Sequence, residues 1–261
     1  FQLSAVRYMQ HRSMSSDLFR GTMPHSIFDS TRPILIGMLH VPPLPGSPQA
    51  TESFSVSRDH VLRDAAALIE GGISNLMIEN FGDTPFFPGT VPAHTVTHLT
   101  TIANNVASRF PDAEIGLNVL RNDGCSALAI AAATDASFIR VNVLSGARLT
   151  DQGIIQGIAH DLLRLRKQLS AESVAILADA IIVSGNATGT SVDNSQLAEA
   201  VEVAGSTPVF IGSGATAESI RKSASQASGF IVGTSVKHDG IVHKPVDKER
   251  VKEIVLATKQ R

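Results

Sequence analysis

The chain is poor in tryptophan, tyrosine and cysteine, and it lacks a long hydrophobic run. Its 261 residues contain no tryptophan, one tyrosine and one cysteine, Cys125. A single cysteine excludes an internal disulfide framework and a metal site built from cysteines alone. The scarcity of tryptophan and tyrosine argues against a platform on which nucleic-acid bases stack. No run approaches the roughly 18 apolar residues that cross a bilayer. We therefore expect no nucleic-acid partner and no integral membrane segment.

An excess of charge of one sign is also missing. The chain has 22 lysines and arginines against 24 aspartates and glutamates, which gives a formal net charge of −2. A chain without a basic field does not attract nucleic acid or an acidic membrane surface by charge alone. Hydrophobic residues make up 43% of the chain, which is ample for a large core.

The N-terminal residues have a composition of their own. The chain begins at Phe1 rather than at methionine, so we expect a processed product or a fragment. From Phe1 to Ser16 there are two arginines and four serines but no acidic residue. Such a composition is typical of a mitochondrial transit segment, although a tail without any targeting role explains it equally well. We therefore treat residues 1–32 as an N-terminal extension and expect a mitochondrial, otherwise cytoplasmic, protein.

Beyond Pro33, short apolar runs alternate with stretches of helical periodicity. The runs are rich in valine and isoleucine and mostly lack polar alternation, as do parallel strands that are buried on both faces. Helical spacing of apolar residues marks Pro92–Phe110, Asp151–Leu169 and Asp247–Thr258. Repeated βα units predict an α/β domain with a parallel sheet over residues 33–261. The apolar runs are Ile34–His40, Asn75–Asn80, Ile115–Leu120, Phe138–Val143, Val174–Gly185, Val209–Gly212 and Phe230–Gly233.

Polar and glycine residues at the ends of these runs favour a TIM-type (β/α) barrel. In a barrel the whole carboxyl-end rim is the active face, whereas an open doubly wound sheet has its site at one switch point. A closed barrel of this type needs eight strands, but only seven runs are present. Val174–Gly185 is too long for one strand of about 5–6 residues. It reads as two strands joined end to end, so we expect a barrel that lacks one βα unit.

Two glycine-rich turns follow the last two runs. The first is Gly212, Ser213 and Gly214, and the second is Gly233, Thr234 and Ser235. Barrels often bind phosphate at these two positions, because glycines let backbone N–H groups approach the anion and a helix start adds partial positive charge. Alternatively, the glycines only make tight turns. We expect a phosphorylated small molecule as the ligand.

Other polar residues at the ends of runs are candidate catalytic groups. Glu79 is suited to be a general base or a ligand of a divalent metal such as Mg²⁺, or it is a buried carboxylate paired with an arginine. An interior Arg140 needs such a carboxylate or a ligand anion. His40 is a proton carrier or ligand, or else a hydrogen-bonded core residue. Asn118 and Asn142 lie on neighbouring runs and, with Arg140, are expected to orient the reacting end.

Two further residues have open interpretations. Lys237 follows the second glycine turn, where it either counters a phosphate or is exposed to solvent. Asp123 precedes a helical stretch and is suited to cap it.

Several segments together resemble the BtpA family, from about Ile34 to the C-terminus. The resemblance implies a barrel related to ribulose-phosphate-binding enzymes, and the family is named for a role in photosystem I biogenesis. It implies no agreed catalytic residues. The segments are Gly37–Pro48, Glu79–Asp83, Gly116–Asp123, Phe138–Val143, Asp151–Gly153, Ile211–Gly214 and Ile231–Ser235.

The resemblance also locates the missing unit. Members of the family have one Ala-Asp pair at the end of strand 5 and, after a helix, a second at the start of strand 6. This chain has only Ala178-Asp179. Asp179, a further candidate catalytic residue, therefore corresponds to either aspartate. Such a loss is expected of a splice variant or of an error in the gene model.

Two functions remain open at this point. The first is an enzyme that acts on a phosphosugar or nucleotide as an isomerase, a lyase or a phosphohydrolase; the last would be expected to use a metal. The second is a non-catalytic biogenesis or assembly factor. A G-x-x-x-x-G-K-[ST] loop is absent, which disfavours a P-loop nucleotidase. Assembly into a homo-oligomer is compatible with both.

Overall fold

The structure, a computed structural model, describes residues 33–150, 153–177, 181–183, 194–205, 208–212 and 214–259. The expected N-terminal extension and the candidate residues Asp179 and Ser213 lie outside these ranges.

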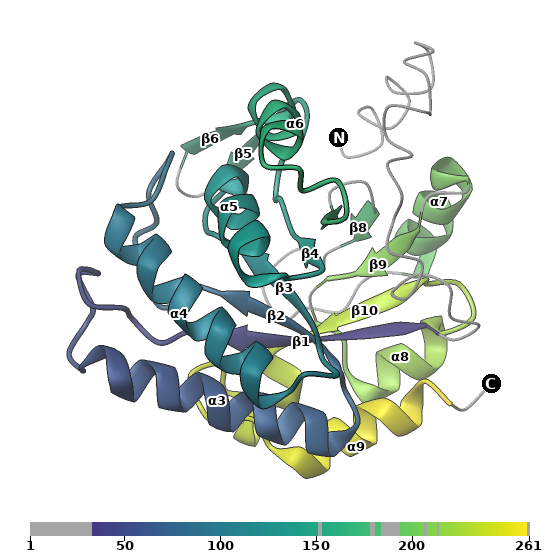
Figure 1. Cartoon of the computed structure of the whole chain (residues 1–261). Coiled ribbons are helices and arrows are strands. Elements are labelled where there is room, and N and C mark those ends of the chain that lie inside the picture. The colour runs from purple at the N-terminus through teal and green to yellow at the C-terminus, as the bar shows by residue number, and fades with distance from the viewer. Residues whose placement is uncertain are drawn as a thin grey trace.

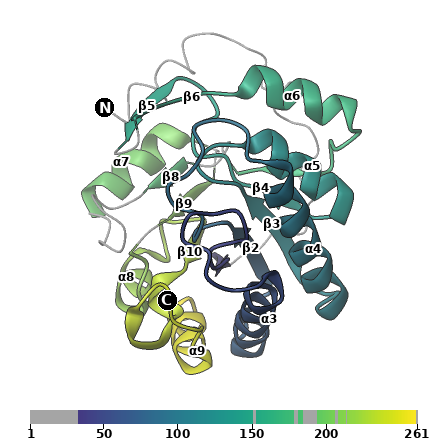
Figure 2. The same ribbon diagram turned by 90° about the vertical axis from the view of Figure 1, so that its left-hand side faces the viewer.

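A single sheet of parallel strands lies at the centre of the molecule, and helices surround it (Figures 1 and 2). The predicted TIM-type (β/α) class is confirmed. The sheet has eight strands, one more than the number of apolar runs, because the long fifth run forms two of them. In spatial order they are β7 (Ala175–Ile176), β4 (Phe138–Ile139), β3 (Glu114–Asn118), β2 (Asn75–Glu79), β1 (Ile34–His40), β10 (Gly229–Val232), β9 (Val209–Ile211) and β8 (Ile181–Val183).

Strands β7 and β8 are the two edges of this sheet, although they follow one another in the chain. Only residues 177–180 separate them. Parallel neighbours need a crossover connection of a dozen or more residues, usually a helix, so these two strands are too closely linked to pair side by side. No pairing between them occurs in the part of the chain that the structure describes. The barrel is therefore open at this seam, where we expected a missing unit.

The helices pack on the outer face of the sheet. They are α3 (Phe54–Gly71), α4 (Ala93–Arg109), α5 (Gly124–Thr134), α6 (Ala159–Gln168), α7 (Asn194–Ala204), α8 (Ala217–Ser223) and α9 (Lys248–Ala257). Two short 3₁₀ turns, η2 (Thr234–Val236) and η3 (His238–Gly240), follow β10. Gly72 ends α3 in the left-handed conformation with φ of 104°, which glycine tolerates. Asp123 caps α5 by accepting a hydrogen bond from the Ser126 N–H at 3.0 Å.

One helix prediction was partly wrong. Within Asp151–Leu169, the first described residues form strand β6 (Gly153–Gln156), which pairs antiparallel with β5 (Ala147–Thr150), and α6 starts only at Ala159. Gly153 has φ of 99°, which suits a turn rather than a helix. Consequently Ile154, which we expected on a buried helix face, is 61% exposed, and it lies opposite Leu149 in the hairpin.

The core has two parts. The larger part fills the space between sheet and helices. The smaller part fills the inside of the sheet with alternate residues of the strands, because successive side chains of a strand point to opposite faces. Its members are Ile34, Ile36, Met38, Met77, Phe138, Ala175, Leu177, Phe210 and Ile231.

Candidate active site

Most of the candidate residues continue the inner face of the sheet toward the carboxyl ends of the strands. His40 lies two positions after Met38, and Glu79 lies two positions after Met77, so both side chains share the inward direction of the core residues. The strand register sets His40 directly beside Glu79, and Glu79 beside Asn118. The pairing of Gly116 with Phe138 continues this level to Arg140 on the next strand. Gly212 lies two positions after Phe210, and Gly233 lies two positions after Ile231. The two glycine turns therefore also continue the inner face of the sheet.

Glu79 is the centre of a buried polar group. Its Oε2 accepts a short hydrogen bond from Asn118 Nδ2, and it lies 3.9 Å from Arg140 NH1. The other carboxylate oxygen, Oε1, lies 3.9 Å from His40 Nε2. Burial raises the pKa of Glu79, and the opposing charge of Arg140 and the Asn118 hydrogen bond offset part of this rise. The expected pairing of Glu79 with Arg140 is present, and both the catalytic and the structural interpretation of Glu79 remain compatible with it.

His40 is held as a neutral imidazole. Burial, and then the positive charge of Lys237, lowers the pKa of His40 from 6.5 to about 3. Its ring packs against Phe81, with the ring centroids 4.6 Å apart. Gly233 is glycine for a steric reason, since a Cβ there would lie 2.8 Å from His40 Cε1. The second glycine turn and the imidazole are therefore in direct contact.

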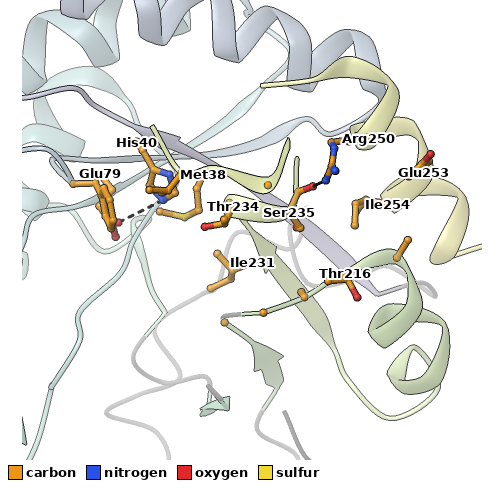
Figure 3. Close-up of a pocket in the computed structure, with 18 of the residues that line it drawn as sticks. Met38, His40, Glu79, Thr216, Ile231, Thr234, Ser235, Arg250, Glu253 and Ile254 are labelled. Carbon is orange, nitrogen blue, oxygen red and sulfur yellow. Dashed lines mark hydrogen bonds and ion pairs between the residues drawn. The ribbon is translucent and has the colours of Figure 1, made fainter. Parts of the chain in front are cut away.

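The two glycine turns and the polar group line one cavity of about 1120 Å³ (Figure 3). His40 and Glu79 are at one end of it, and Thr234 and Ser235 lie next along it. Arg140 also lines the cavity and lies beside Glu79. The other turn residues on its wall are Gly212, Gly214 and Gly233. Gly214 has φ of 69°, a left-handed conformation that glycine adopts without strain.

Three residues of the cavity wall have a buried polar atom that has no hydrogen-bond partner among the described residues. They are His40 Nδ1, Arg140 Nε and Ser235 Oγ. Leaving a buried donor or acceptor unpaired costs about 1–3 kcal/mol, so such atoms are usually paired with protein, water or a ligand. The cavity is thus equipped for a polar ligand.

Some candidates lie outside this wall. Asn142 is not among the described residues that line the cavity, and its Nδ2 donates to the carbonyl oxygen of Arg121 at 2.8 Å. Asn118 reaches the cavity only through its hydrogen bond to Glu79. The expectation that Lys237 is exposed was wrong. It is fully buried, pairs with Asp64 of α3, and is not among the described residues that line the cavity.

The sequence reasoning missed two groups. Arg250 of α9 lines the cavity and donates through NH1 to the carbonyl oxygen of Ser235 at 3.1 Å. Asp64 holds Lys237, and its Oδ1 also accepts a hydrogen bond from the Val246 N–H at 2.8 Å. Both groups are on helices, Asp64 at 173 residues from Lys237 in the chain and Arg250 at 15 residues from Ser235. An apolar helical pattern was the only local signal, and it does not reveal which polar residue turns inward.

The described residues contain no group of three or more His, Cys, Asp or Glu side chains that could hold a metal ion. Among these residues, too, no helix is both long enough and apolar enough to cross a membrane.

Comparison of sequences finds relatives that align with most of this chain. An uncharacterized protein of Thermococcus kodakarensis is 42% identical, with 89% of this chain and 97% of that protein aligned. The photosystem I biogenesis protein BtpA of Synechocystis is 38% identical, over 88% of this chain and 89% of its own length. An uncharacterized protein of Caenorhabditis elegans described as mitochondrial is 28% identical, over 88% and 94%.

Solved structures resemble the fold at low sequence identity. A tryptophan synthase structure from M. tuberculosis has a TM-score of 0.53 and 14% identity, covering 89% of this chain and 95% of that one. N-(5′-phosphoribosyl)anthranilate isomerase from Pyrococcus furiosus has a TM-score of 0.50 and 13% identity, covering 88% and 100%. At this identity the likeness shows the (β/α) barrel fold alone.

The alignments also account for the open seam. The alignment with the Thermococcus protein runs over 257 residues but includes 89% of this chain, or about 232 of its 261 residues. The relative therefore has about 25 residues without a counterpart here. The BtpA family model matches in two pieces, residues 31–180 and 175–260, which overlap between β7 and β8. Together these matches span the described domain, and the chain belongs to the BtpA family.

Proposed function

We propose that this chain is built as an enzyme that binds a phosphorylated small molecule at the carboxyl-end rim and moves a proton at the opposite end of that ligand. The observation that carries the proposal is the shared cavity, in which both glycine turns and the group of His40, Glu79 and Arg140 form one wall. These residues come from five strand ends that are far apart in the sequence. A wall with an anion-binding part beside an acid–base part suits one ligand with two different ends.

The anion-binding part would consist mainly of backbone N–H groups. Gly212, Gly214 and Gly233 let a phosphate approach the main chain closely. The start of α8 contributes less than the sequence suggested, because Thr216 and Ser219 already satisfy each other in a capping box. The Arg250 guanidinium, held against the Ser235 carbonyl at 3.1 Å, supplies positive charge beside the second turn.

The reacting end supports proton transfer. A carboxyl group whose pKa is raised by burial is a stronger base than an exposed carboxylate and is suited to take up and return a proton. Asn118 and Arg140 hold this carboxyl in place, and the Arg140 guanidinium is close enough to stabilise negative charge that develops on a substrate oxygen. His40, being neutral, would act as a hydrogen-bonding partner rather than as a cation.

Isomerisation or aldol-type cleavage fits this end better than metal-dependent phosphate hydrolysis. Both of the former need one base next to an anion-stabilising group. Divalent ions prefer several oxygen ligands, whereas Glu79 is the only described carboxylate at this end and is already engaged by Asn118.

A pair of isosteric variants tests the proposal. Thr234→Asp adds a negative charge to the second turn, and Thr234→Asn has the same shape without the charge. We expect sugar phosphates and nucleotides to raise the thermal midpoint of the wild type and of Thr234→Asn, because a ligand that binds only the native state stabilises it. Thr234→Asp should lose at least tenfold in affinity. The proposal fails if no phosphorylated compound shifts the midpoint, or if the two variants respond alike.

A non-catalytic assembly role is the second candidate, and the name of the Synechocystis relative supports it. The two functions differ in their need for Glu79. Replacing it with glutamine should abolish the biological effect of an enzyme while the fold persists. An assembly factor should keep its effect.

We also propose a mitochondrial location and a homo-oligomer. The relative described as mitochondrial supports the first, and the exposed pair of Leu149 and Ile154 on the hairpin supports the second. Import into isolated mitochondria tests the location. Light scattering of the wild type and of the Leu149→Ser, Ile154→Ser variant tests association.

A further inference from the structure

The cavity continues past the glycine turns. Figure 3 shows His40 and Glu79 at one end, Thr234 and Ser235 near the middle, and Arg250 and Glu253 at the other end. A phosphate held by the turns would therefore lie near the middle of the cavity. The space beyond it, between α8 and α9, is not needed for a ligand whose phosphate is terminal.

The far end has its own mixed chemistry. Arg250 and Glu253 are one turn apart on α9, so they face the same side of the helix. Glu253 is exposed to solvent, while the adjacent Ile254 is 2% exposed and gives the wall an apolar surface. Ala217 and Glu218 of α8 line the opposite side. Carboxylates beside apolar side chains suit a group that has hydroxyls on a ring.

The volume of the cavity also favours a ligand that extends beyond its phosphate. Small-molecule pockets usually measure about 300–1,000 Å³. This cavity, at about 1120 Å³, exceeds that range, although a sugar monophosphate is smaller than an ordinary drug-sized ligand.

From these observations we infer that the ligand carries its phosphate internally, as a diphosphate that joins a reacting sugar-like group to a nucleoside. The inference rests on the proposed function. The reacting group would lie at Glu79, the diphosphate along the two glycine turns, and the nucleoside between α8 and α9. There the Glu253 carboxylate would accept hydrogen bonds from ribose hydroxyls.

Two matched pairs of compounds test this inference by calorimetric titration. The pairs are glucose 1-phosphate with UDP-glucose, and ribose 5-phosphate with ADP-ribose. In each pair the second compound is the first with a nucleoside monophosphate attached. We expect the extended compound of at least one pair to bind at least tenfold more tightly to the wild type.

The variant Glu253→Gln separates hydroxyl recognition from simple charge attraction. Removing a carboxylate should strengthen the binding of a diphosphate if charge alone matters. If Glu253 accepts hydrogen bonds from ribose, the variant should bind the extended compound severalfold more weakly and the monophosphate unchanged. Lys252→Gln is the control, because Lys252 is on the same helix and pairs with Glu249 at 2.7 Å outside the cavity wall.

The possible outcomes distinguish a failure of this inference from a failure of the proposed function. Monophosphates that bind as tightly as their extended partners would overturn the inference and leave the proposed function intact. Tighter binding of the extended compound that Glu253→Gln does not weaken would also overturn it. If none of the four compounds binds, both the inference and the proposed function fail.

Discussion

At the scale of single residues, the most unusual group is a histidine that stays neutral although a carboxylate lies 3.9 Å away. Burial is the largest cause of the low pKa of His40, the positive charge of the fully buried Lys237 adds to it, and the Asp64 carboxylate opposes part of it. Lys237 in turn is neutralised by Asp64, whose pKa is lowered overall: burial raises it, but the hydrogen bonds from His60 and Lys237 and the Lys237 charge outweigh burial. The ionisation of the candidate site thus depends on an ion pair that lies behind it.

The neutral state of His40 predicts a dependence of stability on pH. Its pKa is about 3 in the folded protein and 6.5 otherwise, so between these values the unfolded chain binds a proton that the folded chain does not. Stability therefore falls as pH decreases below about 6.5, by about 2 kcal/mol for this group between pH 7 and pH 5. Urea unfolding of the wild type and of His40→Gln should show this difference. Equal losses in both proteins would contradict it.

The buried ion pair predicts an asymmetric response to mutation. Lys237→Ala leaves the Asp64 carboxylate buried without its counter-charge, so we expect a loss of about 3–5 kcal/mol in the free energy of unfolding. Lys237→Met combined with Asp64→Leu should recover much of it, since both charges are removed. Lys222→Ala, which breaks an exposed pair with Glu218, is the control and should change little. A double variant no more stable than Lys237→Ala would argue against this account.

Much of the candidate site was predictable because strands alternate. His40, Glu79, Asn118 and Arg140 could be placed at neighbouring strand ends from sequence alone, and the register brings them together. Asn142 was not predictable in the same way. Arg140 directly follows β4, and its N–H still donates to the Leu117 carbonyl oxygen at 2.9 Å, whereas Asn142 lies three residues beyond the end of β4 at Ile139, where the alternation no longer applies. Lys237 and Arg250 depend on tertiary packing that leaves no local pattern.

At the scale of elements, side chains of different sizes fill the inside of the barrel. Met38, Met77, Gly116 and Phe138 lie at one level on four neighbouring strands. Phe138 occupies the room that Gly116 leaves, since a Cβ on Gly116 would lie 2.0 Å from the phenyl ring. The level just above it contains the polar group, so the packing of this layer fixes the height of Glu79 and Arg140.

This fit predicts that Gly116→Ala destabilises the protein. Overpacking of a core typically costs about 1–3 kcal/mol, and here the Phe138 ring is fully buried. We expect a loss in this range by urea unfolding, together with weaker ligand binding. Gly89→Ala is the matched control, because a Cβ there meets nothing within 4 Å. A Gly116→Ala protein as stable as the control would show that the layer adapts freely.

The hairpin of β5 and β6 shows where element prediction failed. Ile154 and Ile158 have helical spacing with the residues of α6, and this periodicity extended the predicted helix too far toward its N-terminus. Gly153 and Gly157, in contrast, indicated that the helix does not extend over these residues. A Cβ on Gly157 would lie 2.5 Å from the Leu144 carbonyl oxygen, so the chain must approach its own backbone there.

At the scale of the whole molecule, the open seam between β7 and β8 is the main departure from a closed barrel. The number of apolar runs predicted a missing unit, and the excess of about 25 residues in the Thermococcus relative agrees with it. The fold class was predictable because repeated βα units fit few architectures. How the seam arose, by splicing or by an error in the gene model, stays a prediction.

The seam predicts that this chain is less stable than a closed barrel. Inserting the corresponding segment of the Thermococcus relative between β7 and β8 would pair both sheet edges. We expect a higher thermal midpoint and a more cooperative transition by calorimetry. Equal midpoints and equal cooperativity for the two proteins would mean that the open seam does not lower the stability of the fold.

The central claim is that the two glycine turns bind phosphate beside Glu79. It can be tested by titrating isotopically labelled protein with inorganic phosphate and following the backbone amide resonances. The account predicts saturable shifts at Gly212, Gly214, Gly233, Thr234 and Ser235, and none at Gly89 and Gly146, which are not among the described residues that line the cavity. Sodium chloride at equal ionic strength should not reproduce them. Unchanged turn resonances at saturating phosphate, or shifts spread evenly over the surface, would contradict the claim.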